Sequence, residues 1–163
     1  MEVDINEQNL PAGIQKIEET PQEIVAKGKE AASLLTGIIK NQKNPVMING
    51  KQYLQFHDWQ TIARFFKTTV GVESVGPIEE GGKVVGYEAK AMVLDNNKEI
   101  ISSAESACYF EEKNWENKEK FQVRSMAQTR ACVKALKNVF SWVIVLAGYN
   151  PDHTATQTKV VND

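Results

Sequence analysis

The stretch FQVRSMAQTRACVKALKNVFSWVIVLAGYN, residues 121–150, predicts one long helix with four cations and no Asp or Glu. Apolar residues recur at helical spacing, and Gly148 followed by Pro151 is typical of a helix end, so we expect the helix from about Lys120 to Ala147. A solvated helix face usually alternates Glu with Lys, because like charges one turn apart repel. The cations of this helix therefore need partners outside it.

Helical spacing separates this stretch into two faces. The apolar face is expected to contain Ser125, Cys132, Val133, Leu136, Val139, Phe140 and Val143. The other face is expected to contain Arg130, Lys134, Lys137, Asn138 and Ser141, with Arg124 and Gln128 at its margin. Charge of a single sign on one face favours a phosphate-binding surface, where affinity comes from released counterions. These cations could instead pair with carboxylates such as Glu88 or Glu105 elsewhere in the fold, or the face could simply be solvated.

Other side chains are weaker candidates for the same surface. Lys90 on a central strand, Lys83 in its hairpin and Arg64 on a short helix could add cations. Binding of single strands without sequence preference usually combines cations with stacking aromatics, and the aromatic candidates are Tyr87, Tyr109 and Trp115. Such aromatics are more often part of a core or an ordinary surface.

The end of the long helix is apolar on nearly every side between Val139 and Ala147. One sheet cannot bury a helix all round, so a second surface has to cover part of it. That surface is either a helix over residues 21–40 or another copy of the chain. The residues expected at this contact are Trp142, Ile144, Val145 and Leu146.

Upstream of the long helix, the chain reads as a hairpin, a short helix and three strands. Asn49-Gly50 predicts a tight turn within residues 45–56, and Asp58 is expected to cap a helix over residues 59–67. Extended segments are expected at residues 69–75, 84–94 and 99–110, joined by PIEEGG and DNNK. Tyr87, Ala89, Ala91 and Val93 alternate with more polar positions, which indicates one face packed on a helix. EEKNWENKEK, residues 111–120, is expected to be a charged surface loop, and its adjacent acids Glu111 and Glu112 to lie in solvent.

The N-terminal part carries its own signals. Thr20, Pro21 and Glu23 form the cap, first turn and capping box of a helix ending near Lys40. We expect a flexible acidic arm over residues 1–20, a single domain over residues 21–150 and a polar tail over residues 151–163. The predicted fold class is α+β: an antiparallel β-meander packed against a long C-terminal helix, with a short helix before the meander and an N-terminal helix.

Composition and missing motifs exclude several classes of protein. With 163 residues, 42% apolar and 25% charged, the chain resembles an ordinary soluble domain. Residues 1–30 hold seven acids and three bases, so the remainder is net basic although the whole chain carries −2. Cys108 and Cys132 match no metal spacing and are expected to be small core residues of a reduced cytosolic protein.

Neither a secretory signal nor an apolar run of membrane-spanning length is present. Nucleotide-binding loops and catalytic triads are also missing, and His57 reads as a residue at a helix start. We therefore expect no catalysis, no metal and no cofactor.

Several segments together resemble a known group of proteins. YLQFHDWQTIARFF, GYEAKAMVLD, EIISSAE and VRSMAQTRACVKALKNVFSWVIVLAGY resemble phage and prophage proteins with an RSMAQTRAxxKALKN-type helix. More remotely, the order of hairpin, helix, meander and basic helix is similar to single-strand annealing recombinases of the Rad-fifty-two superfamily. The resemblance spans about residues 53–149.

This resemblance implies an ATP-independent protein that anneals single-stranded DNA in phage-type recombination. It implies a homo-oligomer, ring or filament, in the cytoplasm of a bacterial host, with a host or phage single-strand-binding protein as a further candidate partner. Lys134 and Lys137 match basic positions of the family's groove. Val133 stands where the family has another cation, and Asp58 stands near a family arginine. The alternative from another class is a phage protein-interaction module that uses the acidic arm and the apolar helix end, without binding DNA.

Overall fold

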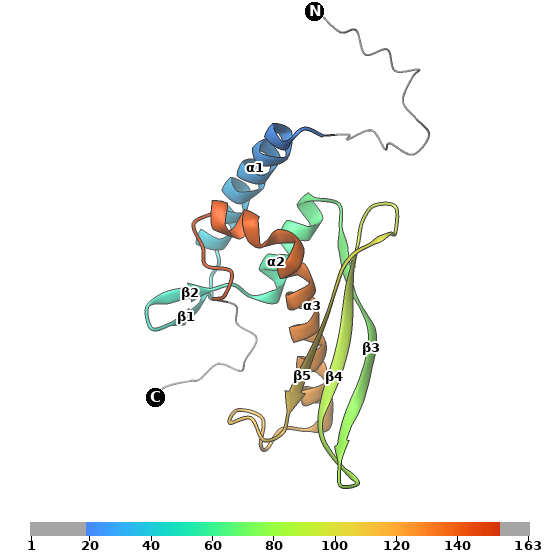
Figure 1. The fold of residues 1–163 in the computed structure, drawn as a ribbon. Coiled ribbons are helices and arrows are strands. Elements are labelled where there is room, and N and C mark those ends of the chain that lie inside the picture. The colour runs from blue at the N-terminus through green and yellow to red at the C-terminus, as the bar shows by residue number, and fades with distance from the viewer. Residues whose placement is uncertain (1–18, 154–163) are drawn as a thin grey trace, which may run out of the picture.

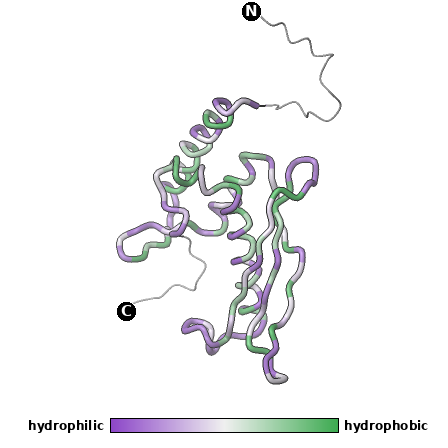
Figure 2. The backbone as a smooth tube through the Cα atoms, in the orientation of Figure 1, coloured by the Kyte–Doolittle hydropathy of each residue, from purple (hydrophilic) through white to green (hydrophobic). Residues whose placement is uncertain are grey.

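The computed structural model describes residues 19–153 and confirms the α+β class (Figure 1). Three antiparallel strands form a sheet with α3 along one face, while α1 and α2 lie at the C-terminal end of α3. Nearly all of the predicted acidic arm, and most of the predicted polar tail, lie outside the described residues. Figure 2 shows polar stretches at the turns of the sheet and in the loop after β5.

The sheet contains β3 (Thr69–Glu80), β4 (Lys83–Leu94) and β5 (Ile100–Tyr109), in that order. The alternation predicted for the central strand is confirmed, because Ala89, Ala91 and Val93 are buried. β3 is longer than predicted and runs on to Glu80, so the turn is reduced to two glycines with positive φ. Pro77 therefore lies inside a strand, which is tolerated because β3 is an edge strand.

The helix α3 (Lys120–Leu146) has the predicted length, and Gly148 follows it with a φ of 82°. Ala127, Ala131 and Ala135 are buried at intervals of four residues, so the helix meets the sheet with short side chains. Short side chains let the two elements approach closely and fill the space between them. Ser125, predicted on the apolar face, is exposed instead, because the buried stripe at this end passes through Val123 and Ala127.

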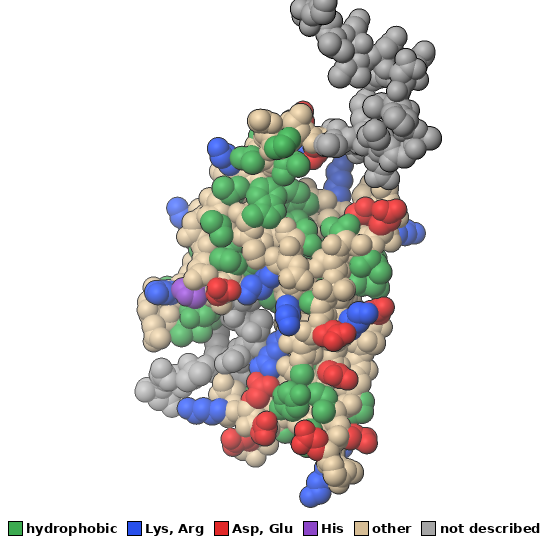
Figure 3. All heavy atoms as spheres, in the orientation of Figure 1, with side chains coloured by type: hydrophobic (Ala, Val, Ile, Leu, Met, Phe, Trp, Pro, Cys, Tyr) green, Lys and Arg blue, Asp and Glu red, His purple; other side chains and the backbone are tan. Residues whose placement is uncertain are grey.

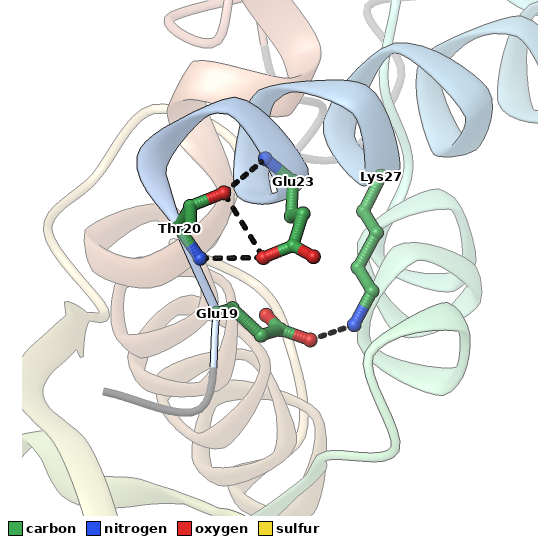
Figure 4. A network of polar contacts seen from close by, with 4 residues as sticks. All are labelled: Glu19, Thr20, Glu23 and Lys27. Atoms are coloured by element: carbon green, nitrogen blue, oxygen red, sulfur yellow. Dashed lines mark hydrogen bonds and ion pairs between the residues drawn. The ribbon is translucent and has the colours of Figure 1, made fainter. Parts of the chain in front are cut away.

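The helix α1 (Pro21–Lys40) begins as predicted. The Glu23 backbone N–H donates to the Thr20 hydroxyl, and the Thr20 backbone N–H donates to the Glu23 carboxylate at 2.6 Å. Figure 4 shows this capping box with the nearby ion pair between Glu19 and Lys27. Its apolar side chains are only partly buried: Leu35 and Ile39 lie in the core, whereas Ile24, Leu34 and Ile38 are exposed.

The helix α2 (Phe56–Phe65) starts earlier than predicted. Gln55 is its N-cap, and Asp58 occupies the third helical position, where its buried carboxylate accepts the Gln55 backbone N–H at 2.7 Å. Gln42 donates to the other oxygen of this carboxylate at 2.5 Å. Asp58 therefore stabilises the start of α2 from its third position, because a side chain there can accept the otherwise unpaired backbone N–H of the N-cap residue.

A two-stranded hairpin, β1 (Val46–Ile48) and β2 (Lys51–Tyr53), precedes α2 and turns at Asn49-Gly50 as predicted. Both turn residues have positive φ, the requirement of a tight hairpin turn. The hairpin projects from the body of the molecule (Figure 1). Two contacts hold its base: the Tyr53 ring stacks on the His153 ring, with centroids 4.9 Å apart, and the Leu54 N–H donates to the His153 carbonyl at 2.8 Å.

The crossing of α1 over α3 depends on a glycine. A Cβ atom at Gly28 would lie 2.1 Å from the Trp142 ring and 3.2 Å from a Leu146 methyl group. Only a residue without a side chain fits at this distance. Within residues 19–153, none of the helices is both long enough and apolar enough to pass through a membrane.

We expect Gly28→Ala to destabilise the protein by about 1–3 kcal/mol, because the methyl group overlaps the Trp142 ring. Gly37 is the matched control, since it lies in the same helix with nothing within 4 Å of an added Cβ. Gly37→Ala should stabilise by about 0.5–1 kcal/mol through helix propensity. Urea unfolding measures both, and Gly28→Ala should lose most of its cost in a Trp142→Ala background. Equal effects of the two alanines would contradict the close crossing.

Candidate nucleic-acid interface

The long helix α3 packs on one face of the sheet, nearest to β5, whose outer edge has no strand partner. The Phe110 N–H bonds to the Val85 carbonyl, which sets the phase of the ladder between β4 and β5. Because antiparallel residues alternate between bonding to the neighbour and facing away from it, Ser103, Glu105 and Ala107 direct their carbonyl groups out of the sheet. These carbonyl groups are the ones that an edge strand leaves without a ladder partner.

Side chains of α3 donate to each of these three carbonyl groups. Arg130 donates to Ala107 at 2.9 Å, Lys134 to Glu105 at 3.2 Å, and Asn138 to Ser103 at 3.4 Å. The spacing fits, since four helical residues rise about 6 Å and two strand residues about 6.6 Å. We call Arg130, Lys134 and Asn138 the edge flank. The acceptors along the strand edge are carbonyl oxygens, so the edge flank requires side chains that donate. A carboxylate of Asp or Glu at these positions would face a carbonyl lone pair.

Arg130 also pairs with Glu112, an acid that was expected to lie in solvent. Arg130 donates through both terminal nitrogens to the Glu112 carboxylate, at 2.8 and 2.7 Å. The same carboxylate accepts the Tyr109 N–H at 2.9 Å. The Arg130 side chain is only 13% exposed. Arg130 thus pairs with a carboxylate of its own chain, and that carboxylate belongs to Glu112 rather than to Glu88 or Glu105.

The pKa values reflect this ion pair. The hydrogen bond from Arg130 lowers the pKa of Glu112, although partial burial acts in the other direction. The hydrogen bond to Glu112 raises the pKa of Arg130. Both groups are therefore charged over the ordinary pH range, and the loop over residues 111–119 is attached to the end of β5.

Three further cations of α3 keep donors that are at least partly exposed. Lys134 is exposed and uses one of its three N–H donors on the Glu105 carbonyl. Arg124 is exposed, and no hydrogen bond or ion pair joins its side chain to another part of residues 19–153. Lys137 is 26% exposed, with its Nζ 3.6 Å from a largely exposed carboxylate of Asp152. Figure 3 shows Lys and Arg side chains down the middle of this face and acidic side chains beside them over the sheet.

The weaker candidates do not join this group. Lys90 projects from the opposite face of the sheet, where its Nζ lies 3.0 Å from Glu73. The hydrogen bond to Glu73 raises the pKa of Lys90. Glu88 and Glu105 share that outer face, so acids outnumber bases there. Lys83 lies at the β3–β4 turn and Arg64 on α2, both exposed and both outside the edge flank.

The aromatic candidates do not form an exposed stacking platform. Trp115 is buried, at 5% exposure, although its loop was predicted to lie at the surface. Tyr87 is half-buried against the core. Tyr109 is half-buried over Gly86, where an added Cβ would lie 3.1 Å from its ring. Binding of single-stranded DNA at this surface would therefore depend on contacts to the phosphate backbone of the DNA.

The apolar end of α3 is divided between core and surface. Ile144 is fully buried, which corrects its prediction as an interface residue. Trp142, Val145 and Leu146 are 37%, 61% and 43% exposed. The helix α1 covers part of this end through Gly28, so one of the two predicted covering surfaces is present.

The cysteines lie in the core, as predicted. Cys108 and Cys132 are both buried and unpaired, and burial raises the pKa of the Cys108 thiol to about 11. Among residues 19–153, no three His, Cys, Asp or Glu side chains are grouped in a way that could hold a metal ion.

We expect the pair of Arg130 and Glu112 to stabilise the fold in a pH-dependent way. Because folding lowers the pKa of Glu112 from its usual value of 4.5, the contribution is complete above that value and disappears in more acidic solution. Glu112→Gln should cost about 1–3 kcal/mol at pH 7, and its difference from wild type should narrow towards pH 3.

Glu111→Gln is the matched control, because the neighbouring Glu111 is exposed. Urea unfolding at several pH values measures the effect. A constant difference between Glu112→Gln and wild type over this range would contradict the ion pair.

Comparisons of the chain with protein-family models, with curated proteins and with solved structures found no match. Support for a function therefore comes from the geometry of α3 and from the RSMAQTRA and KALKN segments of its sequence.

Proposed function

We propose that this protein binds and anneals single-stranded DNA as an ATP-independent, non-catalytic homo-oligomer in phage-type recombination. The observation that carries the proposal is that Arg124 and Lys134 are exposed, and Lys137 partly exposed, along a helix that contains no Asp or Glu. Several cations of this kind suffice to hold a phosphate backbone without contacts to base edges. The RSMAQTRA and KALKN segments resemble phage and prophage proteins, and the order of hairpin, helix, meander and basic helix is remotely similar to that of single-strand annealing recombinases, which supports the same proposal.

Backbone binding agrees with the chemistry that annealing requires. Paired bases have to stay accessible, so contacts to phosphate are more useful than stacking. Lys134 can hold the Glu105 carbonyl with one N–H and a phosphate with another, because an ammonium group has three donors. Arg124 offers a planar fork that suits a phosphate. A single-strand-binding protein of the host or phage, and action in the bacterial cytoplasm, remain parts of this proposal.

The ion pair with Glu112 changes the proposed binding set. Arg130 stabilises the fold, so Arg130→Glu would place two carboxylates against each other and unfold the loop. The residues proposed to bind single-stranded DNA are therefore Arg124, Lys134 and Lys137, with Lys83 and Arg64 as peripheral candidates. Lys90 would contact DNA only if the strand also crossed the acidic outer face of the sheet.

A second candidate function is a protein-interaction module without DNA binding. Large apolar side chains exposed on α1 and at the end of α3 favour it, because such clusters usually mark contact surfaces. The two candidate functions differ in the role of Lys134: in the first it contacts DNA, and in the second it contacts only its own chain.

We expect Lys134→Glu and Arg124→Glu each to weaken binding of a short oligothymidine strand roughly tenfold at low salt, and to reduce the salt slope by about 1. Fluorescence anisotropy titrations over a range of salt concentrations measure both quantities. Arg124→Glu lies at an exposed position, so its thermal unfolding should change little. Lys134→Glu also replaces the donor to the Glu105 carbonyl by an acceptor, so Lys134→Gln, which keeps a donor, is measured beside it and should lose affinity without losing stability.

Lys98→Glu is the control for the change in charge, because Lys98 is exposed in the turn between β4 and β5. It should bind nearly as well as wild type. Wild-type protein without measurable affinity, or equal losses for Lys98→Glu and Lys134→Glu, would overturn the proposed interface.

A further inference from the structure

The chain after α3 folds back and meets the base of the hairpin β1–β2 (Figure 1). Residues 150–153 form a tight turn at this place, which we call the C-terminal turn. The Asp152 N–H donates to the side-chain oxygen of Asn150 at 2.9 Å, and the His153 N–H donates to the Asn150 carbonyl at 3.0 Å. The shape of the C-terminal turn is therefore set by hydrogen bonds to Asn150.

The C-terminal turn is also attached to the hairpin. The His153 ring stacks on the Tyr53 ring with centroids 4.9 Å apart, and the His153 carbonyl accepts the N–H of the buried Leu54 at 2.8 Å. None of these contacts, and neither of the bonds to Asn150, uses the carboxylate of Asp152. The turn therefore holds this carboxylate in place without depending on it.

The Asp152 carboxylate faces one of the cations proposed to bind DNA. Its Oδ1 atom lies 3.6 Å from the Nζ atom of Lys137, and the Asp152 side chain is 86% exposed. Neither Arg124 nor Lys134 forms an ion pair within residues 19–153, so Lys137 is distinguished from them. An exposed ion pair of this kind contributes little to stability. The carboxylate can therefore turn away from Lys137 at small cost while the backbone of the turn stays in place.

A carboxylate and a DNA phosphate compete for the same lysine. Both are anionic oxygen acceptors for an ammonium group, and they repel each other when they share one. A phosphate that approaches Lys137 therefore has to displace the Asp152 carboxylate or bind against its charge. Arg124 and Lys134 impose no such cost, because their neighbours supply no carboxylate to them.

We propose that Lys137 is a phosphate site that Asp152 occupies in the free protein, so that the C-terminal turn lowers the affinity for single-stranded DNA. The carboxylate of Asp152 takes the place of a phosphate until the DNA backbone displaces it. This inference rests on the proposed function and names a residue that regulates the same surface. Removing the charge of Asp152 should therefore strengthen binding, although most acidic residues of the chain are remote from the surface.

Asp152→Asn in the full-length chain tests this competition, because it removes the charge and keeps the size of the side chain. We expect it to tighten binding of the short oligothymidine strand about two- to fivefold at low salt, the range expected from an exposed ion pair. Glu99→Gln is the matched control for the loss of one negative charge, since Glu99 is exposed in the turn before β5. It should change the affinity much less. Fluorescence anisotropy titrations measure all three proteins.

A double-mutant cycle identifies the lysine involved. In a Lys137→Gln background, Asp152→Asn should leave the affinity unchanged, because the carboxylate then has no cation to occupy. A gain that persists in this background would overturn the proposal, and so would an equal gain for Glu99→Gln.

Hydrogen exchange at the Leu54 amide verifies that the C-terminal turn keeps its place, because this amide donates to His153. Tighter binding with unchanged protection of Leu54 supports the competition. Tighter binding together with lost protection would overturn it, because the whole turn would then have detached.

The same titrations separate this inference from the proposed function. Binding that depends on Lys134 but is unchanged by Asp152→Asn would overturn the competition and leave the proposed function standing. No affinity for the strand in either wild type or Asp152→Asn would overturn the proposed function, and the competition with it.

Discussion

The structure depends on how the free edge of β5 is covered. An edge strand presents unpaired backbone groups, and each one that is buried without a partner would cost about 1–3 kcal/mol. Here the bond from Arg130 is partly buried and those from Lys134 and Asn138 are exposed. Arg130, Lys134 and Asn138 supply donors in step with the strand. This match agrees with the register of α3 along the sheet, in which Ala127, Ala131 and Ala135 are buried. The register in turn determines which helical residues are buried and which cations face solvent.

The same constraint explains the charge of the helix. A face that has to donate to carbonyl oxygens excludes Asp and Glu, so an acid-free stripe can arise from packing alone. In the proposed function, phosphate binding would use the donors that packing leaves unpaired on Lys134, Arg124 and Lys137. The two roles are compatible because a lysine ammonium group or an arginine fork has more donors than one carbonyl can accept.

Much of the fold could be predicted from local signals. The capping box at Thr20, the turn at Asn49-Gly50 and the stop at Gly148 act within a few residues, and each begins or ends an element where expected. The extension of β3 through Pro77 could not be predicted, because it depends on which side of the sheet β3 occupies. The position of Asp58 was missed for a similar reason, since carboxylates in the first turn of a helix serve either as cap or as capping-box partner.

The candidate site was less predictable than the fold. The partner of Arg130 lies 18 residues away, in a loop whose composition is typical of solvent, and only the end of β5 brings Glu112 to it. One signal was present: donors at 130, 134 and 138 repeat every four residues, and the outward positions of a strand repeat every two. Combining both periods would have suggested a helix bonded along a strand edge. The burial of Ile144 and Trp115 depends on tertiary packing and carried no such signal.

The opposite edge of the sheet is treated differently, with a consequence for how copies can meet. β3 contains Pro77, which has no N–H to offer, and its pairing with β4 is irregular at Val72/Ser74 and at Ile78/Glu79. Irregular, proline-containing and acidic edges resist the addition of further strands. Helix side chains occupy the edge at β5, and proline and irregular pairing disrupt the edge at β3, so neither edge of the sheet favours the addition of another strand. Copies of this chain can therefore become crowded together without their sheets merging into fibrous aggregates.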